Sequence, residues 1–113
     1  MKLLIVDDER DTLDSLREYL QEEGYEVSTA AHGAEALDVI AHEGRPCAVL
    51  LDLVMPVMSG NEFYAKIKAD PQLATTPVIV FTSDPSTAPV GLPILKKPAR
   101  LEQVLSYVQR YCR

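Results

Sequence analysis

The sequence predicts an α/β domain with one parallel sheet and helices on both of its faces. Apolar runs of strand length alternate along the chain with segments whose apolar residues recur at helical spacing. The run Cys47–Leu51 is apolar throughout, as expected of a central parallel strand that is buried on both faces. At 113 residues the chain is long enough for one domain and too short for two, so we expect a single domain over residues 1–113.

Five strands are expected. Lys2–Val6 is a short apolar run, and Glu26–Ala30 is a second, weaker strand. Cys47–Leu51 is the third strand, and Pro77–Phe81, which is rich in β-branched residues, is the fourth. The short segment Pro93–Leu95 completes the set as the fifth strand.

Helices are expected between these strands and after the last one. The first helix ends at Gly24, a natural stop, and the second spans Gly33–Glu43. The third helix opens at Ser59 or Gly60, and the last one runs from about Arg100. The inward-facing apolar residues are, in chain order, Leu13, Leu16, Leu20, Ala36, Leu37, Ile40, Ala41, Phe63, Ile67, Leu101, Val104, Leu105 and Val108.

Between the fourth and fifth strands, the segment Ser83–Leu92 is the one irregular stretch of the chain. It contains Pro85, Pro89 and Gly91. Proline lacks a backbone donor and blocks the interior of a helix, so a full helix is not expected there.

Composition and charge exclude several classes of function. The 17 acidic residues outnumber the 11 basic ones, and the resulting net charge of -6 disfavours direct binding of DNA or RNA. The apolar start Met1–Val6 is too short for a secretory signal, and no segment approaches the roughly 20 apolar residues of a membrane span. Cys47 and Cys112 show neither CxxC spacing nor a disulfide framework. We therefore expect reduced cysteines and a cytoplasmic chain without membrane insertion.

Polar residues follow the strands at the edge of the sheet where a ligand would bind. In open parallel sheets, ligands lie beyond the carboxyl ends of the strands, near the switch in strand order. Each such residue alone is ordinary turn or capping chemistry, but their coincidence at one edge predicts a site. In strand order they are Asp7 and Asp8, then Asp52, then Thr82 and Ser83, and finally Lys96, Lys97 and Pro98.

The acids of this set predict a metal-assisted reaction at phosphorus. Three carboxylates brought together repel one another, which raises their pKa values or calls for a cation. A hard divalent ion such as Mg²⁺, or Mn²⁺ in its place, takes oxygen ligands and suits a site that receives a phosphoryl group. Asp52 then fits the role of nucleophile, Lys97 would offset charge on the transferring group, and the Thr82 hydroxyl would bond a phosphoryl oxygen.

In this order and spacing, the segments resemble the receiver domains of two-component response regulators, the CheY-like family. The matching segments are Ile5–Glu9, Leu50–Pro56 with Ser59-Gly60, Val78–Ser83 and Lys97-Pro98. The resemblance runs from Met1 to about Cys112. It implies a flavodoxin-like fold, a doubly wound five-stranded parallel sheet in the order 2-1-3-4-5.

The resemblance implies that Asp52 is the phosphoacceptor and that its phosphoryl group comes from a sensor histidine kinase or a histidine phosphotransfer protein. Asp7 and Asp8 would hold Mg²⁺ together with Asp52, Asp8 more directly. The backbone carbonyl of Val54 would complete the protein ligands.

The resemblance also assigns roles to the residues after the last two strands. Thr82 would bind a phosphoryl oxygen and swing inward on activation. Lys97 would form an ion pair with the phosphorylated aspartate, and Pro98 would hold its loop, with a cis peptide bond as one way to do so. Lys96 is the rival for the lysine role, but only Lys97 directly precedes the proline.

Three features depart from the family's pattern. The fourth helix is expected to be missing or reduced to a turn, which removes part of the surface that receivers commonly use for output. Ile94 stands where many receivers carry an aromatic switch residue, and we expect Tyr107 and Tyr111 to pack on the last helix instead. By resemblance, Val54 and Asp84 stand at the two positions that tune the lifetime of the phosphoryl group. Because Val54 has no polar group to orient an attacking water, slow self-dephosphorylation is expected.

We therefore expect a phosphorylatable signalling switch that catalyses only its own phosphorylation and dephosphorylation. It would act on an unknown downstream protein and have no output domain. The alternative that the chain is a receiver excised from a longer protein is left open. One alternative is an interaction module that keeps the fold and is not phosphorylated. Another is a small Mg²⁺-dependent phosphohydrolase with Asp52 as nucleophile, but the chain shows no glycine-rich phosphate loop and no cap.

Overall fold

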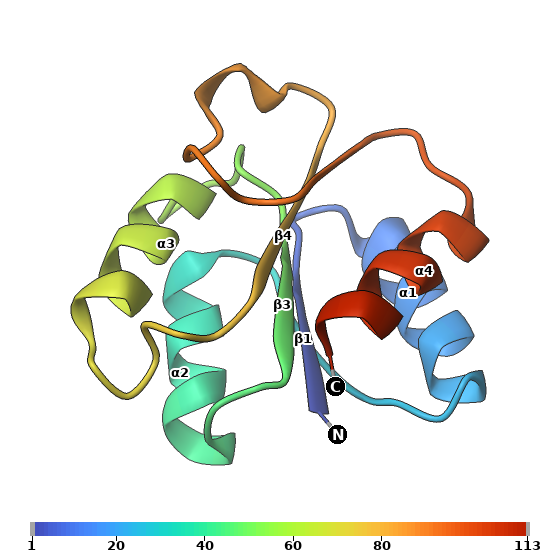
Figure 1. Ribbon diagram of the computed structural model, residues 1–113, viewed down its shortest axis with the longest axis horizontal. Helices are drawn as coiled ribbons and strands as arrows, with labels where there is room; N and C mark the ends of the chain where they lie inside the picture. Colours follow the sequence, from blue (N-terminus) through green and yellow to red (C-terminus); the bar gives the residue numbers. More distant parts are fainter. Residues whose placement is uncertain (1, 113) are drawn as a thin grey trace.

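A five-stranded parallel sheet forms the centre of the computed structural model, which describes residues 2–112 (Figure 1). Its order is β2-β1-β3-β4-β5, which confirms the predicted flavodoxin-like topology. The strands are β1 Lys2–Val6, β2 Glu26–Ala30, β3 Ala48–Leu51, β4 Val78–Thr82 and β5 Ile94–Lys96. The helices are α1 Arg10–Glu22, α2 Gly33–Glu43, α3 Gly60–Ala69 and α4 Leu101–Tyr111.

Three strands begin one residue later in the structure than the sequence predicts, namely β3, β4 and β5, and the last two begin after a proline. The carbonyl of Pro77 accepts a hydrogen bond from the amide of Val49 at 2.9 Å, and that of Pro93 accepts one from Val80 at 2.9 Å. Proline can accept such a bond but cannot donate one. Regular pairing therefore starts at the following residue.

The sheet separates two apolar cores. α1 and α4 cover one face, and α2 and α3 cover the other (Figure 1). Alternate residues of β1 point to opposite cores, with Leu3 and Ile5 on the α1–α4 side and Leu4 and Val6 on the α2–α3 side. Tyr107 and Tyr111, which we expected to pack on the last helix, lie partly buried against the first core. Among the described residues, no helix is long and apolar enough to cross a membrane.

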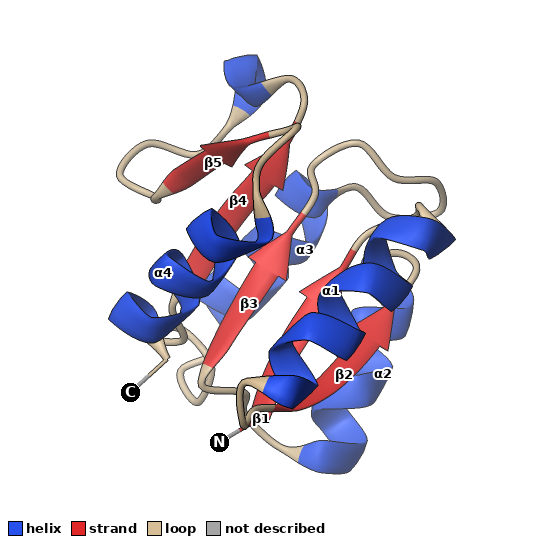
Figure 2. Ribbon diagram, turned by 90° about the vertical axis from the view of Figure 1, so that its right-hand side faces the viewer, coloured by secondary structure: helices blue, strands red, loops and turns tan. Residues whose placement is uncertain are grey.

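The connection from β4 to β5 holds only a 3₁₀ turn, Pro85–Thr87, which confirms the expected loss of a full helix. The Asp84 carboxylate caps this turn by accepting a hydrogen bond from the amide of Ser86 at 3.1 Å. β5 is the edge strand beside it, and one side of β5 is left open (Figure 2). Ile94 is 40% exposed there, whereas its neighbour Leu95 is buried against α4.

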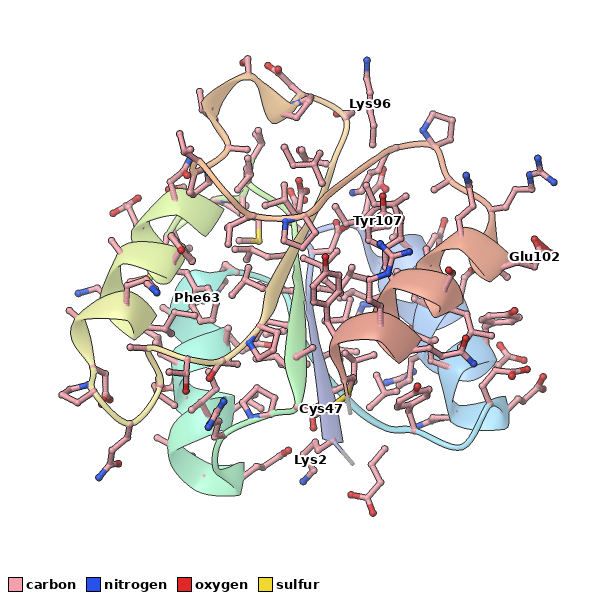
Figure 3. The ribbon with its side chains drawn as sticks, in the orientation of Figure 1. Lys2, Cys47, Phe63, Lys96, Glu102 and Tyr107 are labelled. Carbon is pink, nitrogen blue, oxygen red and sulfur yellow. A yellow bond between two sulfur atoms is a disulfide. The ribbon has the colours of Figure 1, made fainter. Side chains whose placement is uncertain are left out.

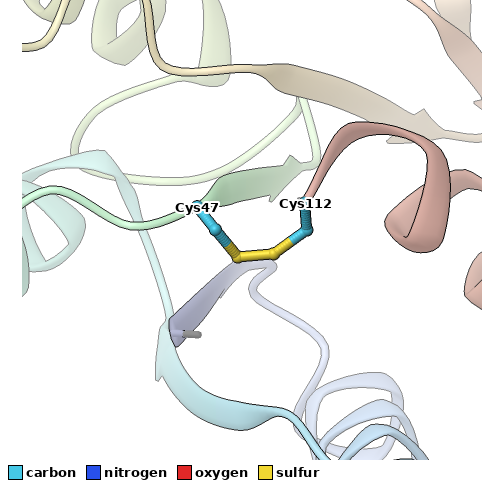
Figure 4. Close-up of a disulfide and its surroundings, with 2 residues drawn as sticks. All are labelled: Cys47 and Cys112. Carbon is cyan, nitrogen blue, oxygen red and sulfur yellow. A yellow bond between two sulfur atoms is a disulfide. The ribbon is translucent and has the colours of Figure 1, made fainter.

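The prediction that Cys47 and Cys112 are reduced is wrong: the structure joins them in a disulfide (Figure 4). Cys47 directly precedes β3, and Cys112 directly follows α4. Their Cα atoms lie 4.8 Å apart although 65 positions separate them in sequence. Because β3 starts and α4 ends at the same end of the sheet, the fold brings the pair together, and no local spacing could have indicated it.

Candidate functional site

The backbone of the sheet places Asp7 and Asp52 side by side. β1 and β3 pair in parallel with Val6 opposite Leu51, so the next residue of each strand emerges at the same edge. The Asp52 amide donates to the Val6 carbonyl at 2.9 Å, and the Asp7 amide donates to the Ala30 carbonyl at 3.0 Å. These bonds fix both residues before their side chains make any contact.

Three carboxylates converge at this edge. One oxygen from each of Asp7, Asp8 and Asp52 lies within 4.8 Å of the other two. Asp7 is 2% exposed and Asp52 is 7% exposed, while Asp8 faces solvent. Burial makes unpaired negative charge costly, so the two inner acids need donors or a cation.

Backbone amides and one lysine supply part of that need. Asp7 Oδ1 accepts from the amide of Glu9 at 2.9 Å, and Asp52 Oδ1 accepts from the amide of Leu53 at 2.8 Å. The second oxygen of each acid faces Lys97, whose Nζ lies 2.6 Å from Asp7 Oδ2 and 3.6 Å from Asp52 Oδ2.

Lys97 is held by its surroundings as well as by its charge. Its amide donates to the carbonyl of Thr82 at 2.9 Å, its peptide bond to Pro98 is cis, and its Nζ lies 5.3 Å from the centre of the Phe81 ring. Lys96, the rival for this role, extends away from the molecule (Figure 3). Of the two lysines, Lys97 is the one that contacts both buried acids.

The charges of the site are not balanced by the protein alone. Burial raises the pKa of Asp7 and the Asp52 carboxylate adds to that rise, although the hydrogen bond from Lys97 opposes it. Burial by itself would lower the pKa of Lys97, but Asp7 and Asp52 together raise it above its ordinary value. One lysine between two buried acids leaves excess negative charge, which a divalent cation would offset.

The loop after β3 returns closely to Asp52. The amide of Gly60 donates to the carbonyl of Leu53 at 2.9 Å, which brings the start of α3 against the end of β3. A Cβ atom on Gly60 would collide with the Asp52 carbonyl oxygen and would lie 2.7 Å from the Leu53 Cα. Only glycine allows this approach without moving the backbone that carries Asp52.

The structure places the other predicted site residues around this centre. Thr82 is buried at the end of β4, next to β3, and its hydroxyl accepts from the amide of Asp84 at 3.5 Å. Val54 is exposed and lines the cleft described below. The proposed contacts of Thr82 with a phosphoryl oxygen and of the Val54 carbonyl with a metal stay predictions.

An open cleft of about 740 Å³ leads to the carboxylates. Its lining includes Asp8, Asp52 and Lys97, together with Ser15 of α1 and Leu101 of α4. Asp52 is the least exposed acid in this lining.

Sequence analysis missed several contributors to the site. The Phe81 ring beneath Lys97 and the amides of Glu9 and Leu53 have no sequence signal, because their roles come from the turn geometry at the ends of strands. Gly60 was part of a matching segment, but its contact with Asp52 depends on how α3 returns to β3. His32 caps α2, accepting from the amide of Glu35 at 3.1 Å.

Comparison with known proteins gives one consistent result. Residues 3–108 match the model of the response regulator receiver domain family. The response regulator MprA of Mycobacterium avium (strain 104) is 36% identical over 120 residues, covering 100% of this chain and 51% of that protein. The chain therefore spans about half the length of such relatives.

Two solved structures extend the comparison to the fold. The chemotaxis response regulator CheY4 of Vibrio cholerae superimposes with a TM-score of 0.87 at 36% identity, covering 97% of both chains. The signal receiver domain of a signal transduction histidine kinase from Syntrophus aciditrophicus gives a TM-score of 0.87 at 30% identity, covering 98% of this chain and 89% of that one.

Proposed function

The chain belongs to the response regulator receiver domain family, and on that premise we propose that Asp52 is its phosphoacceptor. Receiver domains are signalling switches that histidine kinases phosphorylate. The observation that carries the proposal is the contact of Lys97 with both buried acids, Asp7 and Asp52, beside a cleft that Asp52 and Lys97 line.

In the proposed reaction, a carboxylate oxygen of Asp52 attacks the phosphorus of a phosphohistidine. A P–O bond forms as the P–N bond breaks, and the electron pair of that bond stays on the imidazole nitrogen, which takes up a proton. Lys97 stabilises negative charge that develops on the transferring group, and the Thr82 hydroxyl donates a hydrogen bond to one of the phosphoryl oxygens. The domain thus catalyses its own phosphorylation. In its own dephosphorylation, water attacks the phosphorus, the P–O bond to Asp52 breaks, the Asp52 carboxylate is regenerated and inorganic phosphate leaves.

We propose that Mg²⁺ is the cofactor, with Mn²⁺ able to replace it. The donor set fits: three carboxylates converge within 4.8 Å, and oxygen ligands are those that Mg²⁺ prefers. Asp7, Asp8 and Asp52 would hold the ion with the Val54 carbonyl. When bound, such an ion neutralises charge on phosphoryl oxygens.

Phosphorylation would act as a switch through the same contacts. An aspartyl phosphate adds about 1.5 to 2 negative charges and three acceptor oxygens to the site. Lys97 would then exchange its bond with Asp7 for one with the phosphoryl group, and Thr82 would turn toward it. Any surface that these two residues support is biased by that exchange.

The partners follow from this reaction. We propose a sensor histidine kinase or a histidine phosphotransfer protein as the donor, and a downstream protein as the receiver of the signal. We further propose that residues 1–113 act as one receiver unit in the cytoplasm, with output by protein contact rather than by nucleic-acid binding. The exposed side of β5, where the connection lacks a helix, makes the output surface different from that of a receiver with a full helix there.

The proposal is tested by measuring the intact-protein mass after incubation with Mg²⁺ and acetyl phosphate. Wild-type protein is expected to gain one phosphoryl group, and Asp52→Asn protein is expected to gain none. Adding EDTA should abolish the gain. Asp11→Asn is the matched control, because Asp11 lines the cleft but lies outside the three-carboxylate cluster, and it should behave as wild type.

A wild-type protein that gains no phosphoryl group and also forms no beryllium fluoride adduct with Mg²⁺ would overturn the proposal. The fold would then serve as a constitutive protein-interaction module. A gain that persists in Asp52→Asn would overturn the assignment of the acceptor.

A further inference from the structure

The disulfide lies at the opposite end of the sheet from the carboxylate site, and the same two elements connect both places. β3 begins after Cys47 and ends before Asp52, while α4 follows the segment that contains Lys97 and ends before Cys112. β3 and α4 are therefore linked covalently at one end and by the Lys97–Asp52 contact of 3.6 Å at the other.

We propose that Cys47 and Cys112 are a reversible redox pair, which a dithiol reductant opens to release the end of α4. The pair is a second site of chemical modification on this chain, separate from Asp52. Its reactant is a dithiol, such as a protein with two neighbouring thiols.

The two cysteines are held in different ways, which decides what moves when the bond opens. The amide of Cys47 donates to the carbonyl of Lys2 at 2.8 Å, so the sheet keeps Cys47 in place whether or not the bond exists. The amide of Cys112 donates to the Val108 carbonyl of its own helix at 2.7 Å, and its side chain is buried in the core beside α1 and α4. Opening the bond therefore leaves β3 fixed, while the last turn of α4 keeps only its helical hydrogen bonds and its apolar packing and frays more readily.

Access favours attack at Cys47. Cys47 is half-buried, while Cys112 is 2% exposed. Because Cys112 directly follows the helix and Cys47 keeps its backbone hydrogen bond to Lys2, opening the disulfide requires no part of the sheet to unfold. Disulfides that can be reached in the native state are the ones that exchange.

The exchange is balanced by the dithiol. Its thiolate attacks Cys47 Sγ, a mixed disulfide forms, and Cys112 leaves as a thiolate that takes up a proton. The second thiol of the reductant then attacks the reductant's first sulfur, which is bonded to Cys47 in the mixed disulfide, and releases Cys47 as a thiol. The protein disulfide gains two electrons and two protons, and the dithiol is oxidised to a disulfide.

One part of the argument rests on the proposed function, namely the cytoplasmic location. Disulfides are uncommon in that compartment, and those that occur there are mostly transient or redox-sensing. A pair that closes only under oxidising conditions would tighten α4 under those conditions. It would add a redox input to the domain whose other input is phosphorylation.

The test compares the oxidised full-length chain with the same chain after dithiothreitol treatment, under native conditions. Intact mass after alkylation should show no added alkyl group before reduction and two afterwards. Hydrogen exchange of the amides in Leu105–Tyr111 should accelerate about tenfold or more, while the amides of α2 should not change. Oxidised glutathione should then restore the slow exchange.

Two variants sharpen the result. Cys112→Ala should show the fast exchange of α4 without dithiothreitol and no response to it. Asp52→Asn should keep the full redox response, so a failure of Asp52 phosphorylation would not affect this test.

Two outcomes would overturn the inference. In the first, the thiols become alkylatable only when denaturant unfolds the whole chain, so that the bond is a fixed structural link. In the second, they appear under native conditions but the exchange of α4 is unchanged, so that reduction releases nothing.

Discussion

The two ends of the β3–α4 pair are held by different chemistry. At the carboxyl end, Lys97 bridges Asp7 and Asp52 at 2.6 and 3.6 Å, and these contacts are electrostatic. At the amino end, Cys47 and Cys112 share a covalent bond. One end can therefore be rearranged by a change of charge, and the other only by a change of oxidation state.

The difference shows how a small domain can move at one place without loosening everywhere. A phosphoryl group on Asp52 competes for Lys97 because the existing contacts are charge pairs of the same kind. Between the two ends, apolar residues such as Val104 and Val108 of α4 pack in the core, and neither end depends on the other for its own contacts. Each end can then be altered alone, which makes the comparison open to experiment.

The largest expected effect comes from removing the positive charge of Lys97 at the carboxyl end of the sheet. Lys97→Met should lower the free energy of unfolding by about 3–5 kcal/mol at pH 7 without Mg²⁺, because two buried carboxylates lose their common partner. The loss should shrink as the pH falls and Asp7, whose pKa burial already raises, becomes protonated. Urea denaturation at several pH values measures both effects.

Lys96→Met is the matched control for that variant. Lys96 is the preceding residue and extends into solvent, so its loss should change the free energy of unfolding by less than about 0.5 kcal/mol (Figure 3). Equal effects of the two substitutions would mean that the bridge by Lys97 does not stabilise the site.

Removing the bond at the amino end should have the next largest effect. The double variant Cys47→Ala with Cys112→Ala should lower the free energy of unfolding by about 2–4 kcal/mol, because the bond closes a loop across 65 positions of the unfolded chain. Wild-type protein in dithiothreitol should show a similar loss in the same urea titration. No difference between oxidised and reduced wild type would contradict a disulfide in solution.

The two ends also differ in how far the sequence predicts them. Asp7, Asp52 and Lys97 each follow a strand that local hydrophobic patterns identify, and parallel strands must end at one edge. The disulfide joins the start of β3 to the end of α4, so it depends on the relative length and placement of two elements rather than on a local pattern. The contact of Gly60 with Asp52 is likewise a product of the folded loop.

That loop provides the third prediction. Gly60→Ala should lower the free energy of unfolding by about 1–3 kcal/mol, because the added Cβ meets the backbone of Asp52 and Leu53. Acetyl phosphate labelling of Asp52 should slow in the same variant. Gly33→Ala, at the start of α2, is the control: its Cβ mainly meets the flexible side chain of Met58, so a smaller loss is expected.

Mg²⁺ should stabilise the carboxyl end by an amount that depends on pH. At ten times its dissociation constant it should raise the free energy of unfolding by about 1.4 kcal/mol near pH 7. Without the ion, the raised pKa of Asp7 favours the folded state below the ordinary aspartate pKa, and this contribution is lost as the pH rises through the raised value. The gain from Mg²⁺ should therefore vanish in acid.

Thermal unfolding with Mg²⁺ and with EDTA measures this effect. The measurements should run from about pH 3 to about pH 7, which spans the range in which carboxylates titrate. Asp7→Asn should reduce the gain from Mg²⁺ and flatten its pH dependence. A gain that is the same at every pH would place the ion elsewhere on the protein.

The smallest expected effect tests strain in the loop at the carboxyl end. Val57 has a φ angle of 66°, in the left-handed region, and its side chain is 78% exposed. A β-branched residue is unfavourable in that conformation by about 1–2 kcal/mol, whereas asparagine adopts it more readily. Val57→Asn should therefore raise the free energy of unfolding by about 1 kcal/mol, since little packing is lost.

Val90→Asn, at a solvent-exposed valine without a positive φ, should leave the free energy of unfolding unchanged in the same urea titration. If both substitutions have the same effect, the gain comes from replacing an exposed apolar side chain with a polar one, and the loop between β3 and α3 stores no strain.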